Sequence, residues 1–278
     1  MTRCSPCLLS VGFILSTAVS LPAADDAQGP ISLPGGVTDT GGKVGYLSKP
    51  TGGMVAIDLE KGNILWETKE ASRPLVVSGK RLVALAADQK KPNICRVLVL
   101  DTEARGKQLL KSDAMTLPNW AAIGTGLDRP TSFGYGRPEG FQVRSQLATD
   151  TLIVRWWAEE WSGGGARPPR RTNYAAGVAR IHLNTGKVEM KRDDKMEAPT
   201  GTGLAEIQKL PKNIQEVAQR ERWQAGVVVG QRAYGAVRRP ASRLFGRVKE
   251  FVQAVEIKTG KRLWERQYDE YEIFAPPP

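Results

Sequence analysis

The chain has 278 residues, of which 41% are hydrophobic, and it carries 40 Lys and Arg against 29 Asp and Glu. This hydrophobic content is enough for a packed core, so it excludes a wholly disordered chain, a collagen and a long coiled coil. The single histidine, His182, excludes zinc and iron sites that need two or more histidines. The composition therefore favours a globular protein, and its activity has to be argued from motifs.

The N-terminal segment, residues 1–24, has the layout of a secretory signal peptide. One basic residue precedes an apolar run over 7–19, and small residues follow up to Ala23 and Ala24, where cleavage is expected. A membrane anchor is the alternative, but the apolar run is shorter than the ~20 residues of a spanning helix. We therefore expect an exported protein, periplasmic or extracellular, whose mature chain, 25–278, has no transmembrane segment.

Cysteine usage fits this expectation. Cys4 and Cys7 lie in the predicted signal segment, so the mature chain keeps only Cys95, which cannot form an internal disulfide. Its neighbours are strongly apolar, and we expect a buried thiol rather than a reactive one.

A degenerate repeat is the most informative feature of the mature chain. Four segments, near 53–68, 95–112, 176–192 and 250–266, each join an apolar run to a second strand through a turn that contains glycine. This pattern is typical of a β-hairpin whose glycine adopts a positive φ. The repeat residues are Asp58, Gly62, Trp66, Asp101, Gly106, Gly186, Glu256, Gly260 and Trp264, with His182 at the acidic position of the third copy.

Further strand-like runs precede each hairpin, at 31–47, 74–87, 142–157 and 225–237. Two hairpins together form a four-stranded unit, so the sequence predicts an all-β protein of about four such units. An unrelated mixed sandwich with coincidental hairpins is the alternative.

Three insertions interrupt the repeat. The segments 117–140 and 162–172 are rich in glycine or proline and are expected to be long loops. The segment 204–223 has apolar residues at helical spacing on both sides of Pro211, which predicts two short helical turns lying against a sheet.

The segments Asp58–Trp66 and Glu256–Trp264 resemble the repeat of the pyrroloquinoline-quinone-type β-propellers, whose blades end in the pattern A-x-D-x-x-T-G-x-x-x-W. The middle copies depart from it, because Leu110 and Met190 stand at the Trp position. The resemblance implies a single propeller domain over 25–278, with about four four-stranded blades and with loop and short helical insertions.

What the resemblance implies about function depends on what this chain lacks. Quinone-dependent dehydrogenases of this broad family hold their cofactor on the propeller axis, next to an adjacent cysteine pair, a stacking Trp and a calcium ion. This chain has no Cys-Cys pair and is much shorter, so we expect no cofactor and no metal. Non-enzymatic relatives are scaffolds that dock other proteins, which predicts an exported, non-catalytic scaffold.

A carbohydrate-active or quinone-linked enzyme is the alternative function. Trp156, Trp157 and Trp161 are the candidate stacking residues for such a ligand, although we expect this cluster to pack between blades. Glu159 and Glu160 are adjacent on a predicted strand, so they point to opposite faces and cannot act as one catalytic pair. His182 occupies the acidic repeat position and is expected to hydrogen-bond its turn, so we assign no catalytic residue.

Basic residues are concentrated in two places and are expected to attract anions. An exported protein without a recognisable nucleic-acid-binding module is not expected to bind nucleic acid. The expected partner is another envelope or secreted protein, or an anionic polymer; the alternative is a solvated surface that only maintains solubility. The candidate surface consists of Arg167, Arg170, Arg171, Arg232, Arg238, Arg239, Arg243, Arg247 and Lys249.

Overall fold

The described chain is built of β-strands with one short helix, which confirms the predicted all-β class. The computed structural model describes residues 32–33, 35–88, 90–121, 140–162, 170–198, 207–240 and 247–272. The predicted signal segment and most of the two predicted loops lie outside these ranges.

The N-terminal half forms two antiparallel sheets of five strands. In each sheet one strand has only two residues and the other four are longer. Sheet A contains β1 (Ser32–Leu33), β2 (Gly36–Thr38), β3 (Val44–Ser48), β4 (Met54–Asp58) and β5 (Ile64–Thr68), paired in that order. Sheet B contains β6 (Arg73–Ser78), β7 (Arg81–Ala87), β8 (Ile94–Asp101), β9 (Lys107–Lys111) and β10 (Met115–Thr116); β9 and β10 both pair with β8.

The C-terminal half forms two four-stranded antiparallel sheets. Sheet C contains β11 (Gly140–Ala148), β12 (Thr151–Ser162), β13 (Arg170–His182) and β14 (Val188–Arg192). Sheet D contains β15 (Trp223–Val229), β16 (Arg232–Pro240), β17 (Arg247–Glu256) and β18 (Arg262–Glu272). The four predicted hairpins are therefore confirmed as β4–β5, β8–β9, β13–β14 and β17–β18.

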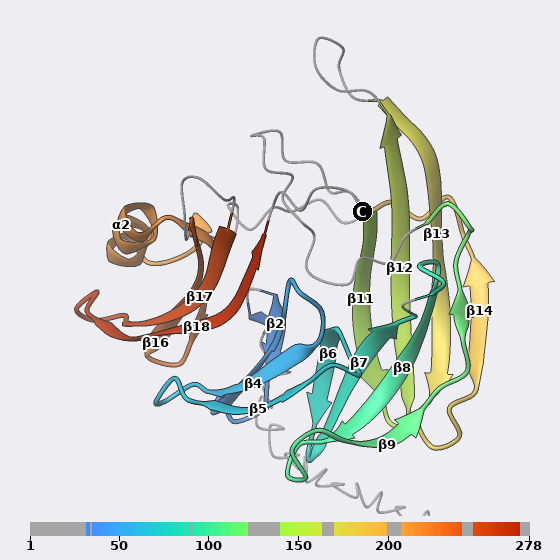
Figure 1. Cartoon of the computed structure of the whole chain (residues 1–278), viewed down its shortest axis with the longest axis horizontal. Helices are drawn as coiled ribbons and strands as arrows, with labels where there is room; N and C mark the ends of the chain where they lie inside the picture. Colours follow the sequence, from blue (N-terminus) through green and yellow to red (C-terminus); the bar gives the residue numbers. More distant parts are fainter. Residues whose placement is uncertain are drawn as a thin grey trace, which may run out of the picture.

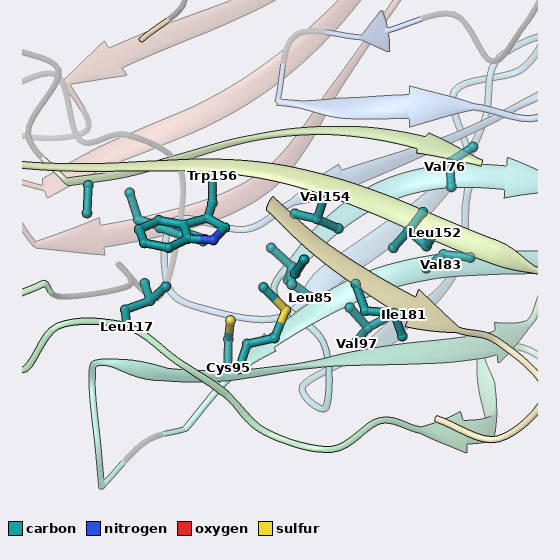
Figure 2. Close-up of a cluster of buried hydrophobic side chains, with 14 of the residues drawn as sticks. Val76, Val83, Leu85, Cys95, Val97, Leu117, Leu152, Val154, Trp156 and Ile181 are labelled. Carbon is teal, nitrogen blue, oxygen red and sulfur yellow. The ribbon is translucent and has the colours of Figure 1, made fainter. Parts of the chain in front are cut away.

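The sheets lie side by side like propeller blades, in the spatial order D, A, B, C (Figure 1). Separate hydrophobic clusters join D to A, A to B and B to C. The cluster between B and C is the largest, and Trp156, Leu152 and Val154 enter it from β12 (Figure 2). Among the described residues no hydrophobic cluster joins C to D, so these residues form an arc with two ends.

The repeat residues make the contacts between neighbouring sheets. Trp264 of sheet D lies on Gly62 of sheet A, where an added Cβ would come within 2.6 Å of the indole. Trp66 of sheet A lies in the same way on Gly106 of sheet B, at 2.7 Å. Both glycines have positive φ, 73° and 78°, as the hairpin pattern predicted. The same glycine thus closes a turn and gives the indole of the next sheet a surface without a side chain.

The other two repeat glycines have different neighbours. Gly186 of sheet C lies against the backbone of Lys111 and Ser112 in sheet B, next to the position where Leu110 replaces Trp. Gly260 of sheet D faces Val217, whose Cγ2 atom is 3.4 Å from the position of an added Cβ. Val217 belongs to the helix α2, so the helix occupies the place that the tryptophan of a further blade would take.

Helix α2 (Lys212–Glu221) begins directly after Pro211 and ends where Arg222 adopts a left-handed conformation with φ 59°. It buries Ile214, Val217 and Ala218 against the outer face of sheet D. This confirms the second of the two predicted helical turns. In the first, Leu204 lies outside the described residues, while Ile207 and Leu210 are buried in the same cluster.

The side chains at the acidic position of the repeat stabilise their turns, except in the third copy, where His182 takes this position. Asp58 accepts hydrogen bonds from the backbone N–H groups of Glu60 and Lys61 at 2.8 and 3.0 Å, and Asp101 makes the equivalent pair. His182 accepts through its backbone carbonyl, from Gly186 at 2.7 Å, whereas its imidazole faces the Thr151 hydroxyl. The predicted turn bond of His182 therefore comes from the backbone and not from the side chain.

Cys95 is fully buried in the cluster between sheets B and C, as predicted. Burial raises the pKa of its thiol to about 12, which keeps the sulfur protonated and unreactive at neutral pH.

The Trp-to-Gly contacts predict a sharp difference between two neighbouring residues. Trp66 is 9% exposed, and Trp66→Ala is expected to lower the free energy of unfolding by ~3–5 kcal/mol. Leu65 is 44% exposed, so Leu65→Ala should change it by less than ~0.5 kcal/mol. Urea unfolding of both variants measures this difference, and equal effects would contradict the docking role of Trp66.

Candidate interaction surface

Most of the described basic residues predicted on sheet D have partners within the protein. Arg238 donates to Glu250 at 2.7 Å, and Lys249 lies 3.7 Å from Glu270. Arg232 donates to the backbone carbonyl of Leu59 in sheet A at 3.0 Å and so helps to join two sheets. Arg243 lies outside the described residues, as do the surroundings of the Arg247 side chain.

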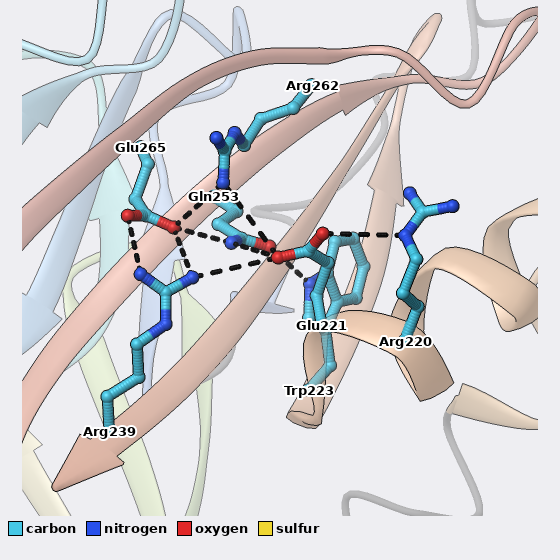
Figure 3. A network of polar contacts seen from close by, with 7 residues as sticks. All are labelled: Arg220, Glu221, Trp223, Arg239, Gln253, Arg262 and Glu265. Carbon is cyan, nitrogen blue, oxygen red and sulfur yellow. Dashed lines mark hydrogen bonds and ion pairs between the residues drawn. The ribbon is translucent and has the colours of Figure 1, made fainter.

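Arg239 belongs to a polar network between sheet D and the end of α2 (Figure 3). It donates two hydrogen bonds to Glu265, at 2.8 and 2.7 Å, and lies 3.6 Å from Glu221. Gln253 accepts a hydrogen bond from the indole of Trp223 at 2.6 Å and donates to both glutamates. These contacts tie the helix end to the sheet.

Charge balance in this network sets the ionisation of Glu265. Burial acts to raise the pKa of Glu265, but hydrogen bonds from Arg239 and Gln253, with the charges of Arg239 and Arg262, outweigh it and hold the pKa below its ordinary value. A lowered pKa in the folded state means that the ionised carboxylate stabilises the fold above the unfolded pKa of 4.5, and that this contribution is lost as the pH falls through the folded value.

We therefore expect Glu265→Gln to lower stability at neutral pH and to reduce the loss of stability on acidification. Urea unfolding of wild type and variant at neutral pH and at about pH 3 measures both effects. As a control, Glu60→Gln, at an exposed turn of sheet A outside this network, should leave the stability at neutral pH close to that of wild type. An unchanged pH dependence in Glu265→Gln would show that the network does not hold this carboxylate.

The hairpin of β12 and β13 projects beyond the other strands and carries the second predicted basic group (Figure 1). Arg171 donates to Glu159 at 3.1 Å and lies 4.6 Å from the ring centre of Tyr174. Arg170 is exposed near the hairpin tip, and Arg167 lies outside the described residues. Glu160 accepts a hydrogen bond from Asn173, so the two glutamates have separate partners, as their opposite faces predicted.

The tryptophans named as candidate stacking residues of the alternative function are buried where their side chains are described. Trp156 is 2% exposed and packs between sheets B and C, and Trp157 is 4% exposed on the other face of β12. Neither indole N–H has a hydrogen-bond partner within the described part of the chain. Trp161 pairs with Arg171 through the backbone. The side chain of Trp161 does not belong to the described part of the structure.

Burial of Trp157 predicts a structural effect of its removal. Trp157→Ala is expected to lower the free energy of unfolding by ~3–5 kcal/mol, whereas a stacking residue on an open surface would leave it nearly unchanged. Arg171→Ala, on the same hairpin, should cost less than ~1 kcal/mol. Thermal unfolding of the two variants distinguishes these roles.

Sequence reasoning missed a basic row on sheet C. Cross-strand register aligns Arg144 with Arg155, Arg155 with Val178, and Val178 with Lys191, across all four strands. These residues alternate with the ones that pack on sheet B, so they lie on the outer face of sheet C. The repeat contains one signal of this row. Arg180 stands two residues before His182, at a position where the other copies have an apolar residue, namely Ala56, Val99 and Ala254.

The described residues contain no group of three or more His, Cys, Asp or Glu residues placed to hold a metal ion. None of their helices is long and apolar enough to cross a membrane.

Comparison with known proteins shows distant likenesses only. No family model and no curated protein matches the chain. Solved structures that align with it include a quinohemoprotein alcohol dehydrogenase from Comamonas testosteroni (13% identity, 87% of this chain, 36% of that chain, TM-score 0.32). A europium-containing methanol dehydrogenase (14%, 86%, 41%, 0.30) and the β-propeller domain of the Trilobed protease from Pyrococcus furiosus (11%, 86%, 55%, 0.29) also align.

The chain spans from about a third to just over half of the length of these proteins. The description of its sheets as blades therefore rests on their own strand order and on the contacts between them.

Proposed function

We propose that this protein is an exported, non-catalytic β-propeller that acts as a scaffold and docks another envelope or secreted protein. The observation that carries the proposal is the difference between the two ends of the arc. At one end, α2 covers the outer face of sheet D. At the other end, the outer face of sheet C carries exposed side chains such as Arg144 and Arg155. The part of this face around Arg144 and Arg155 is thereby open to a partner, whereas Trp157 on the same face is buried.

Side-chain contacts also favour a structural rather than a catalytic role for the candidate residues. His182 faces Thr151, Trp156 fills the core between two sheets, and Cys95 is buried with a protonated thiol. Arg170 remains part of the proposed surface, whereas Arg171, Arg232, Arg238 and Arg239 have intramolecular partners.

Export is supported by the signal-like composition of residues 1–24. If the segment is removed as proposed, protein recovered from the exporting cells should begin at Ala24 or Asp25. The intact mass of the recovered protein measures this directly, and a chain that still begins at Met1 would contradict export by cleavage.

Binding of a partner is tested by capture. The exported protein is immobilised, incubated with an envelope extract, and washed at low and then high salt. We expect one defined protein to be retained through the high-salt wash, because an interface with a packed apolar centre resists screening. Elution of an acidic polymer by salt would instead favour the polymer as partner. Capture of neither would contradict the scaffold function.

A further inference from the structure

The outer face of sheet C differs from the faces that join the other sheets. In sheet A, the pairing of β4 with β5 contains a bulge between Ala56 and Ile57, and Trp66 lies opposite Ala56, facing sheet B. In sheet C, β13 and β14 pair without a bulge, so Met190 lies opposite Ala179, which packs toward sheet B. Because side chains alternate along a strand, the missing bulge turns the docking residue inward.

A charged pair takes the place of the Trp contact on this face. Arg180 lies opposite Glu189, and Glu189 is bound by Lys187 at 3.2 Å. At the position that corresponds to Trp66, the described part of this face therefore has a charged pair and no aromatic ring to place on a glycine of a further blade. Its side chains fit a partner of another kind.

Arg144 and Arg155 are the central feature of the face. They are exposed and lie directly opposite each other on neighbouring strands, ~4.8 Å apart in the pairing direction. Like charges in this position are unfavourable, and neither arginine forms an ion pair with another described residue. Arg180 is diagonal to Arg155, and Lys191 ends the same row. An anionic partner would relieve this repulsion.

Apolar side chains lie among these cations. Ile153 and Val178 are half-buried and occupy the middle strands of the face. Guanidinium groups bind carboxylates with two parallel hydrogen bonds, and arginine is enriched at protein interfaces. A flat face with three arginines around two aliphatic residues therefore favours a protein surface over a polysaccharide, which offers little aliphatic contact.

A second copy of this chain does not fit the face. Pairing two sheet C faces about a twofold axis would bring arginines against arginines. Pairing sheet C with sheet D of another copy is blocked, because α2 covers the outer face of sheet D and Val217 lies on Gly260. Neither of these pairings fits, which favours a different protein as the partner.

We propose that the outer face of sheet C binds an acidic protein surface, whose carboxylates pair with Arg144, Arg155 and Arg180 around a contact with Ile153 and Val178. This assignment rests on the scaffold function proposed above. It adds to that function the position of the docking face and the chemistry of the partner.

The variant Arg144→Glu separates binding from folding. Placing a carboxylate opposite Arg155 replaces a like-charge pair by an opposite one, so the melting temperature should rise or stay unchanged. Affinity for the captured partner should fall at least tenfold at ~0.15 M salt, because one cation is lost and a second is neutralised. Lys261→Glu, an exposed turn residue of sheet D, is the control with the same charge change and should alter the affinity by less than twofold.

Site-specific photo-crosslinking in the exporting cells identifies the occupant. A benzoylphenylalanine at position 178 should form one discrete protein adduct, with the crosslinked peptide rich in Asp and Glu, and the adduct should be lost in the Arg144→Glu background. The same probe at the exposed position 65 of sheet A should not form it. A diffuse polysaccharide adduct, a partner peptide without acidic residues, or an adduct that survives Arg144→Glu would overturn the proposal.

The two proposals fail differently. The immobilised protein could capture a partner that forms no adduct with the probe at position 178 and whose affinity is unchanged by Arg144→Glu. In that case the scaffold function stands and the assignment of the docking face is wrong. If no partner is captured by the wild-type protein under any wash, the scaffold function itself is wrong.

Discussion

The contact between an indole ring and a glycine on the neighbouring sheet is the constraint on which this fold depends. Trp264 on Gly62 and Trp66 on Gly106 set how closely sheets D, A and B approach, because any side chain at the glycine would collide with the ring. Polar contacts then fix the first of these junctions. The carbonyl of Leu59 in sheet A accepts hydrogen bonds from Arg232, Tyr234 and Trp264 of sheet D.

Much of this could be predicted from the sequence because the information is local. A glycine at a fixed distance from an acidic residue and a tryptophan describes one hairpin, and the hairpins near Asp58 and Glu256 follow that description. The order of the sheets in space is not local. Nothing in the sequence near Trp264 indicates that its partner is Gly62, or that Val217 of a helix would take the corresponding place on Gly260.

The candidate surface also depends on contacts between residues far apart in the sequence, which local patterns do not reveal. Clusters along the chain, such as Arg238 and Arg239, are separated by strand alternation, and each then finds a glutamate on its own face of sheet D. Residues far apart in sequence, such as Arg144 and Lys191, are brought into one row by antiparallel register. Register depends on bulges, and the absence of a bulge in β14 could not be predicted from its composition.

The packing of sheet D, the last sheet in the sequence, on sheet A, the first, has a consequence for folding. Sheets A, B and C can pack in the order of their synthesis, but sheet D is made last and packs on the sheet made first, with Trp264 and Leu59 separated by 205 positions. Closing so long a loop is slow, and until it closes, the apolar face of sheet A around Val55 and Ile57 has no cover from sheet D. The incomplete chain is therefore a species prone to aggregation, and a chaperone that shields this face would protect it during biogenesis.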